Sequence, residues 1–534
     1  MKKTETLFIC LATLVCFAVG YRSGLKMSAT EQFKAIPETH SGAFLAAQHA
    51  IYVNDFDAAS AYSASLADID AKVVKNTRMM ADFLSGRLPD GVKELEKESG
   101  TPSRLIYDAY LAEQGDWEKI YSRHKKDDSA FIAPLRIISS AAIKHRTEAI
   151  KFVDSLSTNE SWKAFARGMI YAENGDIEKA EKEFADVHVD FMNINDYLYL
   201  MSFYLHYDYI EDADILREDF AARPGGMFML DYDNIPDWSV FSGYKNALAF
   251  SLIQNISHTQ VMMYSDLSVL LLRFAQIISG DTGNMDAINY YIGQFLFNNN
   301  GDYKPYFDKI SKDSPFYLFV TLRDSEKTND ITKLRQILHT HPSFVPAMSR
   351  VLAYYIAHGD KSSALKTVNR AMDNEKLSDA SHAFLLKNRA QINFVFGDLN
   401  AAQSDIHAAS DVLGIDEDIL SIQSKIWSAQ NRELETAYDY GMTLVRLNMS
   451  NVCAWEVLAR AIAVREGDDA ALELVERVGE VAKECSSLFE FLGDLYSRGG
   501  NTKLARDAYM RAIDLSEDGL VIVPQIEKKV RKLK

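Results

Sequence analysis

Apolar residues recur every three or four positions along most of the chain, which is the spacing of one face of an α-helix. The pattern is clearest in Ser486–Glu517. The first part of this stretch places four residues at i, i+3, i+4 and i+7, namely Phe489, Leu492, Gly493 and Tyr496. Because these positions share one helix face, the stretch is predicted to begin with an amphipathic helix.

The same stretch predicts a second helix after a tight turn. Arg498–Asn501 contains two glycines and an asparagine, residues that supply the positive φ with which helices end. After the turn, small and apolar residues again share one face: Leu504, Ala505, Ala508, Tyr509, Ala512 and Ile513. Gly493 on the first helix and Ala505 on the second leave room for a close approach. The stretch therefore predicts a helical hairpin.

This hairpin resembles a tetratricopeptide repeat. It carries the family's series of aromatic, Leu-Gly, Tyr, Ala, aromatic and Ala residues at the family's spacing, and Glu517 stands where the family has a closing proline. The resemblance implies an all-α fold, an α-solenoid of roughly 11–13 helix–turn–helix repeats. We expect an N-terminal signal or anchor helix to precede it, on the grounds given below for residues 7–21.

Turn residues recur at a near-constant interval, as a chain of such hairpins requires. In the N-terminal half they are 29 to 33 residues apart, at Asn54, Gly86, Gly115, His145, Gly175 and Asp208. In the C-terminal third they fall at Gly359, Gly397, Asn431, Gly467 and Gly500. Between these blocks the rhythm is broken, and the pairing of helices there stays open.

The patterns divide the chain into seven segments. These are 1–21, a signal peptide or membrane anchor; 22–40, a linker; 41–224, N-terminal repeats; 225–266, an irregular insert and helix; 267–340, degenerate helical repeats; 341–520, C-terminal tetratricopeptide repeats; and 521–534, a capping helix.

The N-terminal segment predicts export. Lys2 and Lys3 precede an uncharged apolar run over residues 7–21, which is typical of a signal-peptide core and short for a membrane span. We expect the repeats to be periplasmic, or held on the non-cytoplasmic side by residues 7–21 in the membrane. Whether this segment is cleaved stays open.

Charge and motifs narrow the classes of function. The formal net charge of −17 disfavours nucleic-acid binding by a broad surface. The sequence lacks the common motifs of hydrolases, metalloproteases, nucleotide-binding loops and redox enzymes, so we expect no catalytic residues, no cofactor and no metal site. His339 and His341 are two ligands short of a zinc site, and 231–237 lacks the glycine and glutamate of a calcium loop.

Cys453 and Cys485 are the two cysteines outside the N-terminal segment. They lie at the start of one hairpin and just after its end, positions that antiparallel helices bring together. In an oxidising compartment they are candidates for a disulfide, and two free buried thiols are the alternative.

The irregular stretch 225–243 is unusually apolar for a loop. We expect it to pack on the solenoid as core filler or inside its groove, with a partner-facing loop as the alternative. Its apolar residues are Met227, Phe228, Met229, Tyr232, Ile235, Trp238 and Phe241.

The resemblance also implies a binding surface, since the first helices of tetratricopeptide solenoids line the concave face. In that register the predicted partner-binding residues are Trp162, Phe165, Met169, Tyr291, Phe295, Phe384 and Phe394. Polar neighbours suit an extended peptide or an amphipathic helix, namely Asn195, Asn298, Lys387 and Gln391. The alternative is that these aromatic residues belong to the core.

These observations favour a non-catalytic protein–protein interaction scaffold of the cell envelope, with protein or peptide partners. Two alternatives remain. One is an accessory subunit for the export or assembly of an envelope polymer, either polysaccharide or peptidoglycan. The other is an enzyme whose site lies in 225–300, which a cleft lined by paired carboxylates would support.

Overall fold

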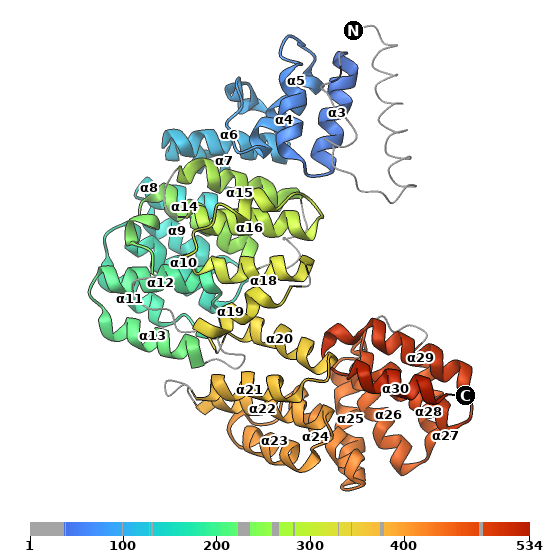
Figure 1. The fold of residues 1–534 in the computed structure, drawn as a ribbon. Coiled ribbons are helices and arrows are strands. Elements are labelled where there is room, and N and C mark those ends of the chain that lie inside the picture. Colours follow the sequence, from blue (N-terminus) through green and yellow to red (C-terminus); the bar gives the residue numbers. More distant parts are fainter. Residues whose placement is uncertain are drawn as a thin grey trace. The chain divides into compact units, whose positions relative to one another are not determined.

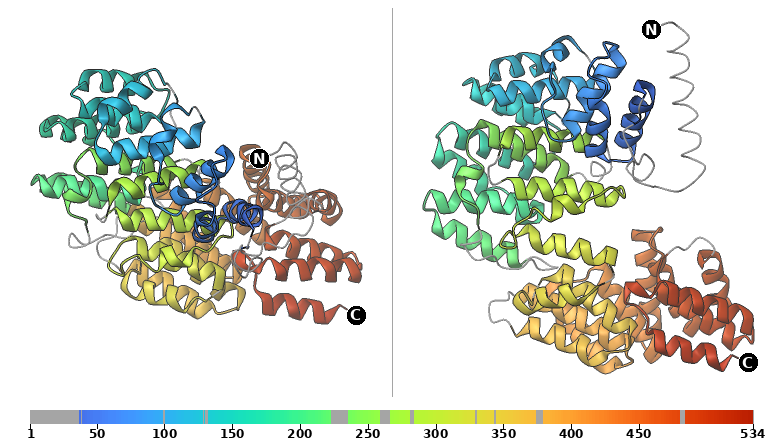
Figure 2. Two further views of the ribbon diagram at one scale, coloured as in Figure 1. Left: turned by 90° about the horizontal axis from the view of Figure 1, so that it is seen from above. Right: turned by 45° about the horizontal axis from the view of Figure 1, so that its top comes forward.

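A computed structural model describes residues 37–533 except 38, 99, 128, 130–131, 223–234, 259–265, 281–283, 329, 343, 374–378 and 480–483. Within these residues every regular element is a helix (Figures 1 and 2). None of the described helices is both long enough and apolar enough to cross a membrane. The all-α prediction is confirmed.

The chain forms two compact units, one made of residues 1–214 and 230–320 and the other of 215–229 and 321–534. Helices α13 (Ile210–Ala222) and α18 (Phe316–Thr328) run across the boundaries between the units. The other α-helices of the first unit are α3 (His40–Tyr52), α4 (Phe56–Ala64), α5 (Lys72–Leu84), α6 (Thr101–Gln114), α7 (Trp117–His124), α8 (Ala133–Ala142), α9 (Arg146–Ser155), α10 (Glu160–Glu173), α11 (Ile177–Ala185), α12 (Ile194–His206), α14 (Tyr244–Ser257), α15 (Asp266–Ser279), α16 (Met285–Asn298) and α17 (Lys304–Phe307).

The second unit is a series of hairpins followed by one further helix. Its helices are α19 (Thr332–Thr340), α20 (Val345–Ala357), α21 (Lys361–Met372), α22 (Asp379–Val395), α23 (Leu399–Leu413), α24 (Glu417–Gln430), α25 (Leu434–Leu447), α26 (Val452–Arg465), α27 (Asp468–Gly479), α28 (Ser486–Arg498), α29 (Thr502–Asp514) and α30 (Val523–Lys532). Short 3₁₀ turns lie at Val92–Lys97, Val189–Phe191, Trp238–Val240 and Ser516–Asp518.

The predicted turn residues adopt the left-handed backbone conformation that ends a helix. Positive φ angles occur at Asn54, Gly86, Gly115, Gly175, Asp208, Gly359, Gly397, Asn431, Gly467 and Gly500, and at Lys144 beside the predicted His145. At several turns the next residue caps the second helix: Asp116 accepts from the Lys119 amide, and Asp360 accepts from the Ser363 amide. Each turn therefore encodes one helix end and one helix start.

A glycine on the first helix lets an aromatic ring of the second helix pack against its backbone. A Cβ at Gly493 would lie 2.5 Å from the Tyr509 ring. The same relationship joins Gly168 to Phe184 and Gly293 to Phe307, at 2.3 and 2.4 Å. This close approach confirms the predicted hairpin of α28 and α29 and explains why its first helix needs a residue without a side chain.

The break in the repeat rhythm has a structural cause in the first unit. Helix α14 packs against α8 and α10, and α15 packs against α5 and α6 (Figure 1). These four partners are first helices of N-terminal hairpins. The α14–α15 pair therefore covers the first-helix surface of that block instead of continuing the stack.

Aromatic rings pack together where α14 meets the N-terminal helices. Phe250 of α14 stacks on Phe165 of α10 and also packs on Tyr199 of α12. Trp238 and Phe241 lie buried against Tyr199, as expected for an apolar segment that packs on the solenoid. The residues 227–229 and Tyr232 of the same apolar stretch lie outside the described part of the chain.

In the second unit, the first helices α22, α24, α26 and α28 contact one another in sequence. The segment after α29 returns to α20, where a Cβ on Gly519 would lie 2.6 Å from the Ala353 Cα atom. Helix α30 follows, and its Ile526 is buried in the core of the last hairpin. The surface formed by α22, α24 and α26 is called the inner face below.

Candidate binding surface

Four of the seven predicted partner-binding residues lie in the core of the first unit. Phe165, Met169, Tyr291 and Phe295 are only 0%, 2%, 6% and 1% exposed. For Phe165 and Met169 the register on the first helix is as expected, but α14 covers them: Phe250 stacks on Phe165, and the Ser251 hydroxyl lies 3.8 Å from the Met169 sulfur. The expectation that these four side chains line an open groove is therefore wrong.

The other three predicted residues are half-buried. Trp162 lies on α10, and Phe394 packs against a buried cluster that contains Ala390 and Ile406. Phe384, on α22, lines a pocket on the inner face of the second unit. The inner pocket thus contains Phe384 together with its predicted polar neighbours Lys387 and Gln391.

This inner pocket has a volume of about 300 Å³ and is lined by three successive first helices. Its surface mixes apolar, amide and charged groups. The lining residues are Phe384, Lys387, Asn388 and Gln391 of α22; Glu417, Asp418, Ser421, Ile422 and Lys425 of α24; Leu444 of α25; Asn451, Cys453 and Ala454 at the start of α26; and Leu520 from the segment after α29.

Ion pairs connect the first helices across the inner pocket. The Lys387 ammonium lies 2.8 Å from a carboxylate oxygen of Asp416 and 2.8 Å from one of Asp418. It also lies 5.2 Å from the centre of the Phe384 ring, within cation–π range. Burial lowers the pKa of Lys387, but the two carboxylates outweigh this and raise it above its usual value. Lys387 therefore stays charged and ties α22 to the start of α24.

A second ion pair connects the next two first helices. Glu456 of α26 is fully buried and lies 2.7 Å from the Lys425 ammonium of α24, and it also pairs with Arg460. Burial raises the pKa of Glu456, but the two cations outweigh it and lower the pKa to about 2. A charged Glu456 is thus part of the packing between α24 and α26.

The series continues beyond the pocket. Lys529 of α30 lies 2.9 Å from Glu490 and 2.7 Å from Asp494, both on α28. Asp494 also accepts a hydrogen bond from the Tyr509 hydroxyl of α29. The last helix is thus held by the same kind of contact that joins the first helices.

Several polar groups of the inner pocket remain available for a ligand. Gln391 and the Glu417 carboxylate have no hydrogen-bond or ion-pair partner within the part of the chain that the structure describes. Asn451 uses its carbonyl oxygen to cap α26, at 3.1 Å from the Cys453 amide. Its amide N–H₂ group can therefore still donate.

The structure joins Cys453 and Cys485 in a disulfide, with their Cα atoms 5.6 Å apart. The bond links the first turn of α26 to the residue before α28. Cys453 lines the inner pocket, so this covalent link lies at the edge of the candidate site.

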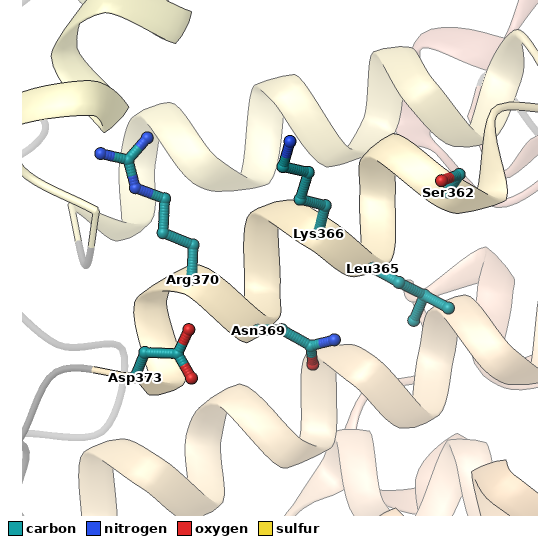
Figure 3. A pocket seen from close by; sticks show the side chains of 6 residues that line it. All are labelled: Ser362, Leu365, Lys366, Asn369, Arg370 and Asp373. Carbon is teal, nitrogen blue, oxygen red and sulfur yellow. The ribbon is translucent and has the colours of Figure 1, made fainter.

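A second hollow lies on α21, away from the inner face. Its lining comes from this one helix, as Figure 3 shows: Ser362, Leu365, Lys366, Asn369, Arg370 and Asp373. Arg370 is held by the backbone oxygen of His339 at 2.9 Å and by its ring at 3.0 Å. Because a single exposed helix surface offers few converging groups, the inner pocket is the better candidate.

The described residues offer little support for the enzyme alternative. No group of three or more His, Cys, Asp or Glu side chains among them could hold a metal ion. In 225–300 the described helices α14, α15 and α16 pack against neighbouring helices, and their facing residues are largely buried. The described part of 225–300 is thus largely packed core.

Sequence reasoning did not single out the acidic partners Asp416, Asp418 and Glu456. A signal for them exists, because Lys387 and Asp416 are 29 residues apart and Lys425 and Glu456 are 31 apart. Both separations are close to one repeat. A charge of one sign on a first helix and the opposite charge one repeat later predicts a contact between neighbouring first helices.

Stacked hairpins with interacting first helices define the chain as an α-solenoid, a helical-repeat protein. Residues 487–518 match the family model described as "Tetratricopeptide repeat". The α28–α29 hairpin is therefore a tetratricopeptide repeat. No curated protein matches the chain significantly.

Solved structures of low sequence identity are similar to parts of this chain, with low TM-scores. One is a tetratricopeptide repeat protein from Parabacteroides merdae, at 10% identity and a TM-score of 0.35, covering 47% of this chain and 98% of that one. Another is the Cut9–Hcn1 hetero-tetramer of the APC/C, at 12% identity and a TM-score of 0.33. The match covers 92% of this chain and 96% of that one. A third is yeast Tom70, at 11% identity and a TM-score of 0.27. The match covers 92% of this chain and 95% of that one. With such TM-scores these likenesses carry no functional argument.

Proposed function

We propose that this chain is a non-catalytic scaffold that binds protein or peptide partners on the inner face of its second unit. The observation that carries the proposal is the inner pocket itself, to which three successive first helices contribute. Phe384 and Gln391 come from α22, Glu417 from α24 and Ala454 from α26. An apolar surface with a few unused polar groups is typical of a binding site. Solenoids commonly use such a repeated surface for partners.

The first helices of the first unit differ from those of the second unit in what covers them. In the first unit the corresponding first helices are covered by α14 and α15, and Phe165 on one of these first helices is buried in the core. The inner face of the second unit keeps a cavity at the equivalent helices. The proposal therefore places recognition in the second unit.

Affinity purification with variants tests the proposal. The full chain is used as bait beside a Phe384→Ala, Gln391→Ala variant, with partners identified by mass spectrometry. The matched control is Lys366→Ala, Met510→Ala, which changes exposed positions on the second helices α21 and α29. We expect the wild type and the control to retain the same partners and the pocket variant to lose them, with unchanged circular dichroism. Equal recovery by all three baits would contradict the proposal.

We also propose that the protein is exported, with the repeats outside the cytoplasm and the N-terminal segment as a leader or anchor. Lys2, Lys3 and the uncharged apolar run over residues 7–21 support this. Alkaline phosphatase fused after residue 40 should be active in cells, whereas the same fusion lacking residues 1–21 should be inactive. Equal activity of both fusions would contradict export.

A further inference from the structure

The inner pocket carries an imbalance of charge at one end. At the start of α24, three consecutive residues carry carboxylates: Asp416, Glu417 and Asp418. Glu417 and Asp418 line the pocket, and the cation at this end is Lys387, which pairs with Asp416 and Asp418. Lys387 already contacts both aspartates. One ammonium group therefore leaves an excess of about two negative charges at this edge of the cavity.

The three carboxylates differ in how many of their oxygen atoms accept a hydrogen bond. One Asp416 oxygen caps α24 by accepting from the Ile419 amide at 2.8 Å, and the other accepts from Lys387. Asp418 gives one oxygen to Lys387 while its side chain stays 71% exposed. Glu417 lines the cavity and has no partner within the described residues. Glu417 and the second Asp418 oxygen can thus accept from a ligand.

The other end of the cavity offsets at most one of these charges. Lys425 lines it, but its ammonium is 2.7 Å from the buried Glu456 carboxylate. Arg460 shares the same carboxylate and lies over the Phe491 ring of α28, outside the pocket lining. An anionic ligand would therefore meet cations that are already paired and, in Glu417, a carboxylate without a partner in the described residues.

Apolar and amide groups lie next to the free carboxylates. Ile422, Leu444 and Leu520 supply apolar walls, and Phe384 supplies a ring. Gln391 and the Asn451 amide can bond a peptide backbone. A side chain with an aliphatic stem and a cationic end matches this combination, since the stem packs on apolar surface while the charged end reaches carboxylates.

We propose that the inner pocket selects a peptide segment with a lysine or arginine side chain, which is directed at Glu417 and Asp418. This inference rests on the proposed function, since it names the chemistry of the partner bound on the same inner face. It also predicts discrimination against acidic peptides, because an added carboxylate would lie beside Glu417, which has no cationic partner in the described residues.

A random hexapeptide library displayed on phage tests the inference with the full-length chain as target. We expect lysine or arginine to be enriched at one position among the selected peptides. A synthetic binder should lose affinity about fivefold when this arginine is replaced by the neutral isostere citrulline, and the difference should shrink at high salt. Fluorescence anisotropy with labelled peptides measures both effects.

The decisive variant is Glu417→Gln, which keeps the shape and removes an exposed charge without breaking an ion pair of the described residues. It should abolish the preference for arginine over citrulline. The matched control, Glu473→Gln on α27, changes a carboxylate that is 71% exposed and pairs only with Arg477 of its own helix. The control should keep the preference.

The outcomes separate this inference from the proposed function. Binders that depend on Phe384 but show no basic preference overturn the inference and leave the proposed function standing. An unchanged arginine preference in Glu417→Gln also overturns the inference. If no selected peptide is sensitive to Phe384→Ala, both the inference and the choice of the inner pocket fail.

Discussion

Phe165 and Phe250 stack in the core of the first unit, with ring centres 5.6 Å apart and planes 15° apart. Phe165 belongs to a first helix of the N-terminal repeats, and Phe250 belongs to the helix that covers them. The contact belongs to the cover that α14 forms over the N-terminal first helices, and it explains why Phe165 is unexposed. It also leaves the second unit as the part with an accessible inner face.

Removing the Phe250 ring should destabilise the first unit strongly. Phe250 is 0% exposed, so Phe250→Ala leaves a cavity beside Phe165 and Tyr199. We expect a loss of about 3–5 kcal/mol in the free energy of unfolding, measured by urea denaturation followed by circular dichroism. Tyr52→Ala, at a side chain that is 64% exposed, is the control and should change stability little. A small effect at Phe250 would mean that α14 is not part of the core.

Adding one methyl group to the α28–α29 hairpin should also be costly. In Gly493→Ala the new Cβ would lie 2.5 Å from the Tyr509 ring, so ring and helix must shift. We expect a loss of about 1–3 kcal/mol. Gly499→Ala is the matched control, because Gly499 has φ −75° and its nearest neighbour is 3.5 Å away. Equal stability of the two variants would contradict the close packing.

Much of the fold is predictable from sequence because its determinants are local. The left-handed residues at Gly115 and Gly359 and the capping aspartates after them mark each hairpin within a few positions. The cover formed by α14 is different, since Phe250 is 85 residues from Phe165. Nothing local distinguishes a first-helix aromatic that meets another helix from one that meets a partner.

The buried carboxylate of Glu456 should make the second unit sensitive to acid. Its pKa is lowered to about 2 in the folded chain, against an ordinary value of 4.5. A depressed carboxyl pKa gives stability that is present above the unfolded pKa and is lost as the pH falls through the folded one. The contribution at stake between pH 4.5 and 2 is on the order of 3 kcal/mol.

Glu456→Gln tests this by removing the titrating group. The variant should be less stable at pH 7, because Lys425 and Arg460 lose their common partner. Its stability should fall less than that of the wild type between pH 4.5 and 2, as measured by urea unfolding at each pH. Parallel pH profiles for the two proteins would show that Glu456 is not the linked group.

Reducing the Cys453–Cys485 bond should destabilise the second unit. The bond closes a loop over a separation of 32 residues, which corresponds to about 3–4 kcal/mol on the chain-entropy model. We expect a lower melting temperature in reducing agent and in Cys453→Ser, Cys485→Ser, with no further effect of reductant on the double variant. Free thiols in the purified native protein, counted by mass spectrometry after alkylation, would contradict the pairing.

The central claim is that partners bind the inner face of the second unit. Site-specific photocrosslinking tests it most directly, with benzoylphenylalanine placed at Gln391 or Ser421 of the inner pocket and at Lys366 of α21 as the outward control. We expect a crosslinked partner from Gln391 and Ser421, which is lost when Phe384→Ala is added, and none from Lys366. Crosslinking from Lys366 alone, or equally from all three positions, would contradict it.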